Sequence, residues 1–120
     1  MTRANPPPVT SAPVASLLAE VAAAVERARS LRNSDPAQGI RIASEALAQA
    51  RALAEISPDA PGTIDVCNAR TLLADVLTAL GHCERMTSAL TDSAAHCSEA
   101  ASRYAALNVP HGEAVARRGL

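Results

Sequence analysis

Three cysteines and three histidines are the clearest candidates for chemistry in this sequence of 120 residues. They are Cys67, His82, Cys83, His96, Cys97 and His111. Thiolates and imidazoles bind zinc, but the sequence has no CxxC or HxxxH pair, and adjacent side chains on a helix point about 100° apart. The same separation keeps a cysteine nucleophile away from a neighbouring histidine base. We therefore predict no catalytic residue, no metal site and no cofactor, and interpret the cysteines as small apolar residues.

A second candidate is a polar stripe on the segment 63–80. Asn68, Thr71, Asp75 and Thr78 follow one another at spacings of three, four and three, which places them on one side of a helix, opposite its apolar residues. Such a stripe could contact a ligand or could be an ordinary solvated face. It lacks the aromatic and basic side chains that usually dominate binding energy.

The element that must position this stripe is a helix ending near residue 80. Its large apolar residues recur at helical spacing and predict one buried face. They are Leu72, Leu73, Val76, Leu77 and Leu80. Gly81 then stands where a helix often ends, because glycine adopts the left-handed conformation without steric penalty. We expect a turn at Gly81–Cys83 and a returning helix over 84–107, with Met86, Leu90, Ala94, Cys97 and Ala101 facing inward.

The N-terminal half shows a similar pattern. A first helix is expected from about residue 13 to 31 and a second over 36–56, separated by Asn33-Ser34-Asp35-Pro36, a helix-start signature. Two prolines and a glycine mark a loop at 57–62, and Gly112 opens a further short helix. Residues 1–12 contain three consecutive prolines without apolar periodicity, which predicts a disordered leader before a helical domain over 13–120.

Composition narrows the function classes. The net charge is −1, the eleven basic residues, all arginines, are scattered among twelve acids, and there is one aromatic residue, so the sequence favours no nucleic-acid partner. No uncharged run reaches the roughly 18 residues that a membrane span requires. With an odd number of cysteines and no secretory signal, we expect a soluble cytoplasmic protein with reduced thiols.

The helical hairpin resembles a tetratricopeptide repeat. Leu73, Ala74, Leu77 and Gly81 fall where that family has its leucine, small residue, aromatic residue and turn glycine. The resemblance implies an all-α fold in which antiparallel hairpins over 13–57 and 63–107, and a third beginning at 110–120, stack as a short right-handed superhelix. It also implies that the polar stripe lines a concave groove that binds a protein or peptide.

Two further observations bear on function. A shift of 47 residues places Ser34 on Gly81 and Leu47 on Ala94, which suggests an internal repeat, and its third copy is cut short at Leu120. The motifs SDPAxxIxxAxxALxxA and LNxPHGEAxA are similar to repeat arrays that precede output domains in bacterial signalling proteins.

The first interpretation is thus a protein-interaction scaffold, the N-terminal part of a larger signalling protein. One alternative is a free-standing helical adaptor that forms homo-oligomers through its C-terminal edge. Another is the N-terminal region of an enzyme, such as a diguanylate cyclase or a histidine kinase, whose catalytic domain follows.

Overall fold

The computed structural model describes the backbone of residues 12–55 and 64–120 and the side chains of 16–55 and 69–120. These ranges contain helices and turns and no strand, so the predicted all-α class is confirmed. The helices are α1 (Ala12–Leu31), α2 (Pro36–Glu55), α3 (Ile64–Met86), α4 (Leu90–Ala106) and α5 (Pro110–Arg117). The predicted leader, except Ala12, and the loop 57–62 lie outside the described residues.

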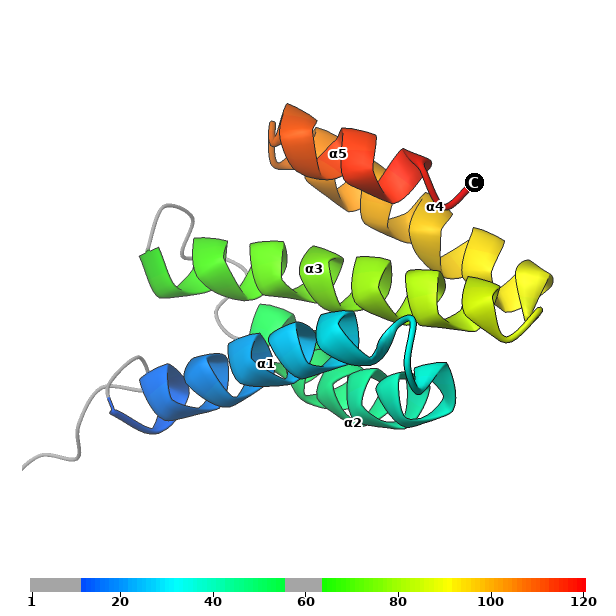
Figure 1. Cartoon of the computed structure of the whole chain (residues 1–120). Helices are drawn as coiled ribbons and strands as arrows, with labels where there is room; N and C mark the ends of the chain where they lie inside the picture. The colour runs from blue at the N-terminus through cyan, green and yellow to red at the C-terminus, as the bar shows by residue number, and fades with distance from the viewer. Residues whose placement is uncertain (1–11, 56–63) are drawn as a thin grey trace, which may run out of the picture.

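Helix α3 is the centre of the fold. Figure 1 shows α1 and α2 on one side of it and α4 and α5 on the other, and α3 contacts all four. The apolar face predicted for it is buried at Leu73, Val76, Leu77 and Leu80 and partly buried at Leu72. No helix in the described part of the chain is both long and apolar enough to cross a membrane.

The turn between α1 and α2 lies where the sequence places it. Pro36 is the first residue of α2, and Asp35 Oδ1 accepts a hydrogen bond from the Gln38 backbone N–H at 3.2 Å. A side-chain acceptor before the first turn satisfies a donor that the helix itself cannot. The helix-start signature is therefore confirmed.

The turn expected at Gly81–Cys83 is wrong, because α3 continues through Gly81 to Met86. The chain instead reverses after Met86, where Ser88 takes the left-handed conformation at φ 68° and α4 begins at Leu90 rather than near residue 84. Gly81 serves packing rather than a turn. A Cβ at this position would lie 2.5 Å from Cys97 Sγ and 3.3 Å from the Ser93 backbone oxygen of α4.

The later start of α4 also changes its inward face. Cys97 and Ala101 are buried as predicted, but Ala94 is exposed, and Met86 and Leu90 are 48% and 62% exposed. Met86 and Leu90 flank the turn, where the hairpin ends and no neighbouring helix of the described chain covers them. The inward positions include Ser93, whose Oγ donates a hydrogen bond to the Gly81 backbone oxygen at 2.7 Å.

The expectation of an internal repeat also changes. The 47-residue shift pairs Ser34, which lies in a turn, with Gly81, which lies inside α3, so it does not align the helices. The C-terminal segment has a partner helix within the chain, because α5 packs on α4 with Gly112 against the ring of Tyr104 and with Ala116 buried. Self-association through this edge stays a prediction.

The close approach at Gly81 generates a stability test. Gly81→Ala should lower the free energy of unfolding by about 1–3 kcal/mol, because the added methyl group overpacks the contact with Cys97. This loss should outweigh the gain of up to about 1 kcal/mol in helix propensity. In a Cys97→Ala background, where the sulfur is absent and the contact with the Ser93 backbone oxygen remains, the loss caused by Gly81→Ala should become much smaller. Urea denaturation of the four chains measures both effects, and an equal loss in both backgrounds would contradict the packing role.

Candidate functional site

A groove of about 750 Å³ lies between α1, α3 and α5. Its wall contains four arginines and two histidines, and none of the described residues that line it is acidic. The charged and imidazole side chains are Arg29, Arg32, Arg85, Arg118, His82 and His111. Thr78, Ala79, Met86 and Val115 supply much of the remaining wall. The fold thus gathers arginines that appear scattered in the sequence.

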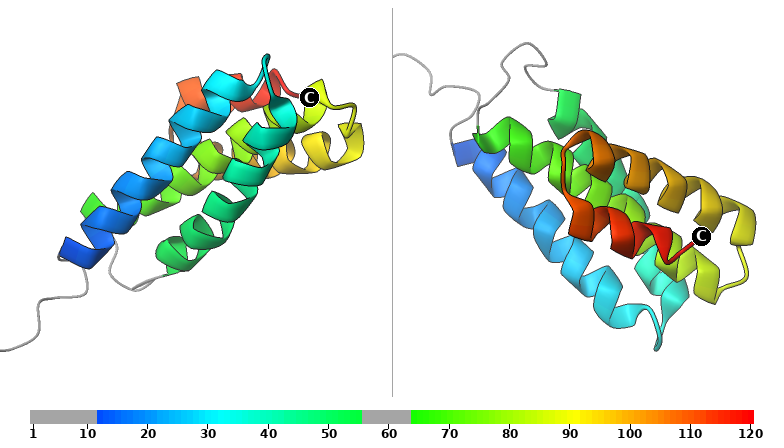
Figure 2. Two further views of the ribbon diagram at one scale, coloured as in Figure 1. Left: turned by 60° about the horizontal axis from the view of Figure 1, so that its bottom comes forward. Right: turned by 90° about the horizontal axis from the view of Figure 1, so that it is seen from above.

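The arginines come together because α1, α3 and α5 run in the same direction and end on the same side of the molecule (Figure 1, Figure 2). Arg29 lies in the last turn of α1, Arg85 in the last turn of α3, and Arg118 directly after α5. A cation is favoured at a helix C-terminus, where the unpaired carbonyls carry partial negative charge. Each position is therefore locally stabilising, and together they make one side of the groove cationic.

One hydrogen bond fixes this end of the groove. Arg85 Nη1 donates to the Arg118 backbone oxygen at 3.1 Å and so ties the end of α3 to the end of α5. Arg29 forms an ion pair with Glu26 at 2.7 Å. Within the described part of the chain, no ion pair involves Arg32, Arg85 or Arg118. Three guanidinium groups therefore line the groove without a carboxylate partner among the described residues.

His82 lies in the middle of the groove wall on α3. Its Nε2 atom is buried and has no hydrogen-bond partner among the described residues. Burial lowers the pKa of His82 below its usual value, nearby Arg32 lowers it further, and the backbone of Val115 acts in the opposite direction. The imidazole is therefore neutral at neutral pH.

The polar stripe predicted on α3 is not a solvated face opposite the core. Thr78 is buried and donates a hydrogen bond to the Ala74 backbone oxygen at 2.9 Å, and Asp75 accepts one from the hydroxyl group of buried Tyr104 on α4. Thr71 is half-buried, and the Asn68 side chain lies outside the described residues. Of these candidates, Thr78 lines the groove. Asp75 thus contacts α4 and Thr78 bonds to its own helix, because helices cover α3 on both sides.

The cysteines and the remaining histidine pair have structural surroundings. Cys83 and Cys97 are buried, and burial raises the pKa of both thiols, which keeps them protonated and weakly nucleophilic. His96 Nδ1 lies 2.6 Å from a carboxylate oxygen of buried Glu84. Among the described residues, no group of three or more histidine, cysteine or acidic side chains is placed to hold a metal ion. The Cys67 side chain lies outside the described residues.

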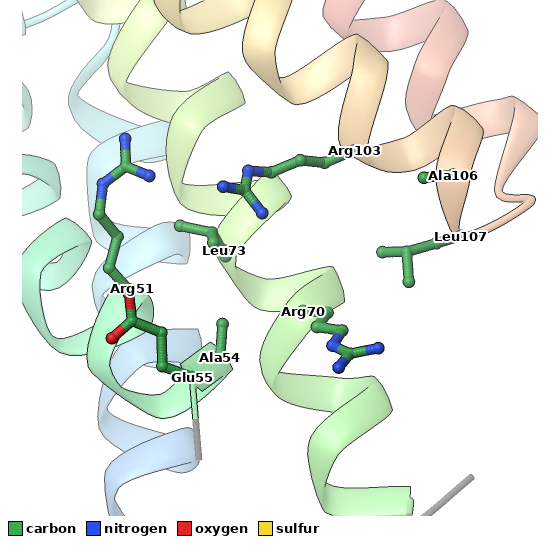
Figure 3. A pocket seen from close by; sticks show the side chains of 8 residues that line it. All are labelled: Arg51, Ala54, Glu55, Arg70, Leu73, Arg103, Ala106 and Leu107. Atoms are coloured by element: carbon green, nitrogen blue, oxygen red, sulfur yellow. The ribbon is translucent and has the colours of Figure 1, made fainter. Parts of the chain in front are cut away.

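A smaller pocket of about 280 Å³ lies between α2, α3 and α4, and Figure 3 shows arginines and Glu55 around its apolar wall. Two of its arginines are already engaged by one carboxylate. Arg51 donates two hydrogen bonds to Glu99 at 2.9 and 3.0 Å, and Arg103 Nε donates one at 2.8 Å. These guanidinium groups lower the pKa of Glu99 to about 2. This pocket therefore has its own counter-charges, whereas the groove has none in its described wall.

Comparison with protein-family models, with curated proteins and with solved structures found no match. The proposed function is therefore based on the shape and charge of the groove.

The Glu99 cluster generates a pH test. The folded-state pKa of Glu99 lies below its unfolded value, so its stabilising effect is present above about pH 4.5 and is lost as the pH falls toward 2. Glu99→Gln should lower the free energy of unfolding by about 1 kcal/mol at pH 7, a modest value because the arginines are partly exposed. The difference from the native chain should shrink across that acidic window.

A control for this test is Glu113→Gln, which removes a carboxylate that pairs with Arg117 inside a single helix. We expect little change from it, because exposed pairs four residues apart contribute about 0.3–0.5 kcal/mol. Urea melts at several pH values compare the variants. A Glu99→Gln effect that stays constant down to pH 2 would show that the ion cluster is not its cause.

Proposed function

We propose that this chain is a protein-interaction module that receives an acidic, extended segment of a partner protein in the groove between α1, α3 and α5. The observation that carries the proposal is the uncompensated charge of the groove. Arg32, Arg85 and Arg118 line it without an ion-pair partner in the described part of the chain, and its described wall has no carboxylate. Guanidinium groups bind carboxylates through paired hydrogen bonds, so an acidic occupant supplies the missing partners.

The shape and apolar content of the groove favour a peptide over a nucleic acid. Ala79, Met86 and Val115 lie beside the arginines, so the wall offers apolar contacts as well as charge. Single-stranded nucleic acids are usually held by stacking on aromatic rings. The one aromatic residue of the sequence, Tyr104, is buried and hydrogen-bonded to Asp75.

A tetratricopeptide-like arrangement is part of the proposal. Successive helices form antiparallel pairs, and the first helices of the pairs, α1, α3 and α5, lie along the same groove (Figure 2). Leu73, Ala74 and Leu77 are buried in α3, at the positions on which the family resemblance rests. Gly81 departs from the family pattern because it lies inside the helix. These features support a short superhelix with a concave binding surface.

The proposed biological role follows from the same resemblance. The chain acts as a regulatory scaffold in the cytoplasm, without catalytic residues of its own, and forms part of a larger signalling protein. Its motifs over 34–50 and 107–116, which are similar to bacterial signalling arrays, support this role.

A charge reversal in the groove tests the proposal. Arg32→Glu should weaken binding of an oligo-aspartate peptide by about tenfold or more, because it replaces an attractive group with a repulsive one. The matched control is Arg41→Glu, which makes the same charge change on the exposed surface of α2, where Arg41 donates a hydrogen bond to Gln38. Fluorescence anisotropy with a labelled peptide measures both dissociation constants. The salt concentration is kept fixed, because at 0.1 M exposed charges more than about 10 Å apart are largely screened from one another.

Two results would contradict the proposal. Equal weakening by Arg32→Glu and Arg41→Glu would show that net charge, and not the groove, attracts the peptide. Tighter binding of a single-stranded oligonucleotide than of the peptide, lost in Arg32→Glu, would assign the groove to a nucleic acid instead.

A further inference from the structure

We infer that filling the groove with an acidic segment is coupled to the uptake of a proton by His82, so that the module binds its partner more tightly in mildly acidic conditions than at neutral pH. The inference rests on the proposed function and adds a form of regulation to the same site. It follows from where His82 lies among the charged groups of the groove.

Charged and titratable groups face or flank His82 from each side. Arg29 and Arg32 approach from α1 and the turn after it, and His111 and Arg118 approach from α5 and its flanks. On α3 itself, Arg85 lines the same groove, and Glu84 is turned toward His96 of α4. The thiol of Cys97 lies nearby, beneath Gly119.

These surroundings disfavour a positive charge on His82. The carboxylate nearest in sequence, Glu84, is engaged by His96, so it does not offset the arginines. His82 Nε2 has neither solvent contact nor a hydrogen-bond partner among the described residues, and a protonated ring would leave this donor unsatisfied. The lowered pKa of His82 agrees with this geometry. The end of α5 also packs closely on the ring, since a Cβ on neighbouring Gly119 would lie 3.1 Å from its Cδ2 atom.

An acidic occupant reverses this balance. Carboxylates that pair with Arg32, Arg85 and Arg118 bring negative charge into the groove. This charge lowers the positive electrostatic potential that opposes protonation of His82. Burial, the largest cause of the lowered pKa, is not relieved by the occupant, so the inference is that removal of the arginine repulsion outweighs it and the pKa of His82 rises on binding. By linkage, a ligand that raises the affinity for a proton is itself bound more tightly when the proton is present.

The other two histidines lack this combination. His111 also lines the groove but is exposed. His96 faces Glu84 on the opposite side of α3 and does not line the groove. His111→Gln is therefore a matched control for His82→Gln, because both remove one imidazole from the groove.

The test is calorimetric titration of the native chain with an oligo-aspartate peptide at pH 7.5 and pH 5.5, in buffers with different heats of ionisation. Aspartate has an ordinary pKa of about 3.9, so the peptide keeps nearly all its charge across this range. Linkage to one proton can change the dissociation constant by at most about tenfold per pH unit. We expect binding at least about threefold tighter at pH 5.5, with measurable proton uptake there.

The variants assign the effect. His82→Gln should lose most of the pH dependence, measured as the ratio of its own dissociation constants at pH 7.5 and pH 5.5, whereas His111→Gln should keep it. Should His82→Gln fold poorly, proton uptake by the native chain still decides. Peptide binding with no proton uptake at pH 5.5, or a pH dependence lost in His111→Gln and kept in His82→Gln, overturns the inference and leaves the proposed function intact. No peptide binding at either pH overturns the proposed function itself.

Discussion

The fold depends on close contacts between helices at glycine residues. With no phenylalanine or tryptophan, the core is built mainly from alanine, leucine and valine, so the helix backbones must approach one another to exclude water. Two buried cysteines fill the space that absent side chains leave. A Cβ on Gly39 would lie 2.7 Å from Cys83 Sγ, and one on Gly81 would lie 2.5 Å from Cys97 Sγ. Each thiol thus joins α3 to a neighbouring helix where a larger side chain has no room.

These contacts also position the groove. Cys97 lies against both Gly81 in α3 and Gly119 after α5, so one buried sulfur packs between these two segments. The hydrogen bond from Arg85 to the Arg118 backbone lies at the same place. Arginines that each help to end a helix are therefore held together by core packing, and the groove is cationic as a consequence of how the helices are packed.

The sequence predicts the helices well and their ends less well. Apolar residues at helical spacing identify α3 and its buried face, and Asp35-Pro36 identifies the start of α2, because both signals are local. Gly81 misleads because glycine is favoured both at helix ends and where backbones touch, and only the contact with Cys97 decides between them. The true turn contains Ser88 in the left-handed conformation, where a glycine would have been the expected signal.

The candidate site was harder to predict for a related reason. The groove takes Arg29, Arg32, Arg85 and Arg118 from three separate segments, and no spacing in the sequence links them. The sequence predicts a binding site on the polar stripe from Asn68 to Thr78 instead, because polar residues on a helix usually face solvent. That rule fails on a helix covered from both sides, where Thr78 bonds to its own backbone and Asp75 to Tyr104. Contacts between α3 and its neighbours, and not its own periodicity, decide which polar groups are available.

His82 is affected both by the close packing at Gly119 and by the charge of the groove arginines. Its ring lies beside Gly119, which also packs against Cys97, and the arginines at the helix ends line the same groove. A more mobile imidazole could take up a proton by turning into solvent, and its charge would then be independent of the groove. With its Nε2 atom buried, His82 is inferred to respond to whatever neutralises the arginines. The tight glycine contacts that replace a conventional aromatic core therefore also place this histidine where, on our inference, its protonation follows the occupancy of the groove.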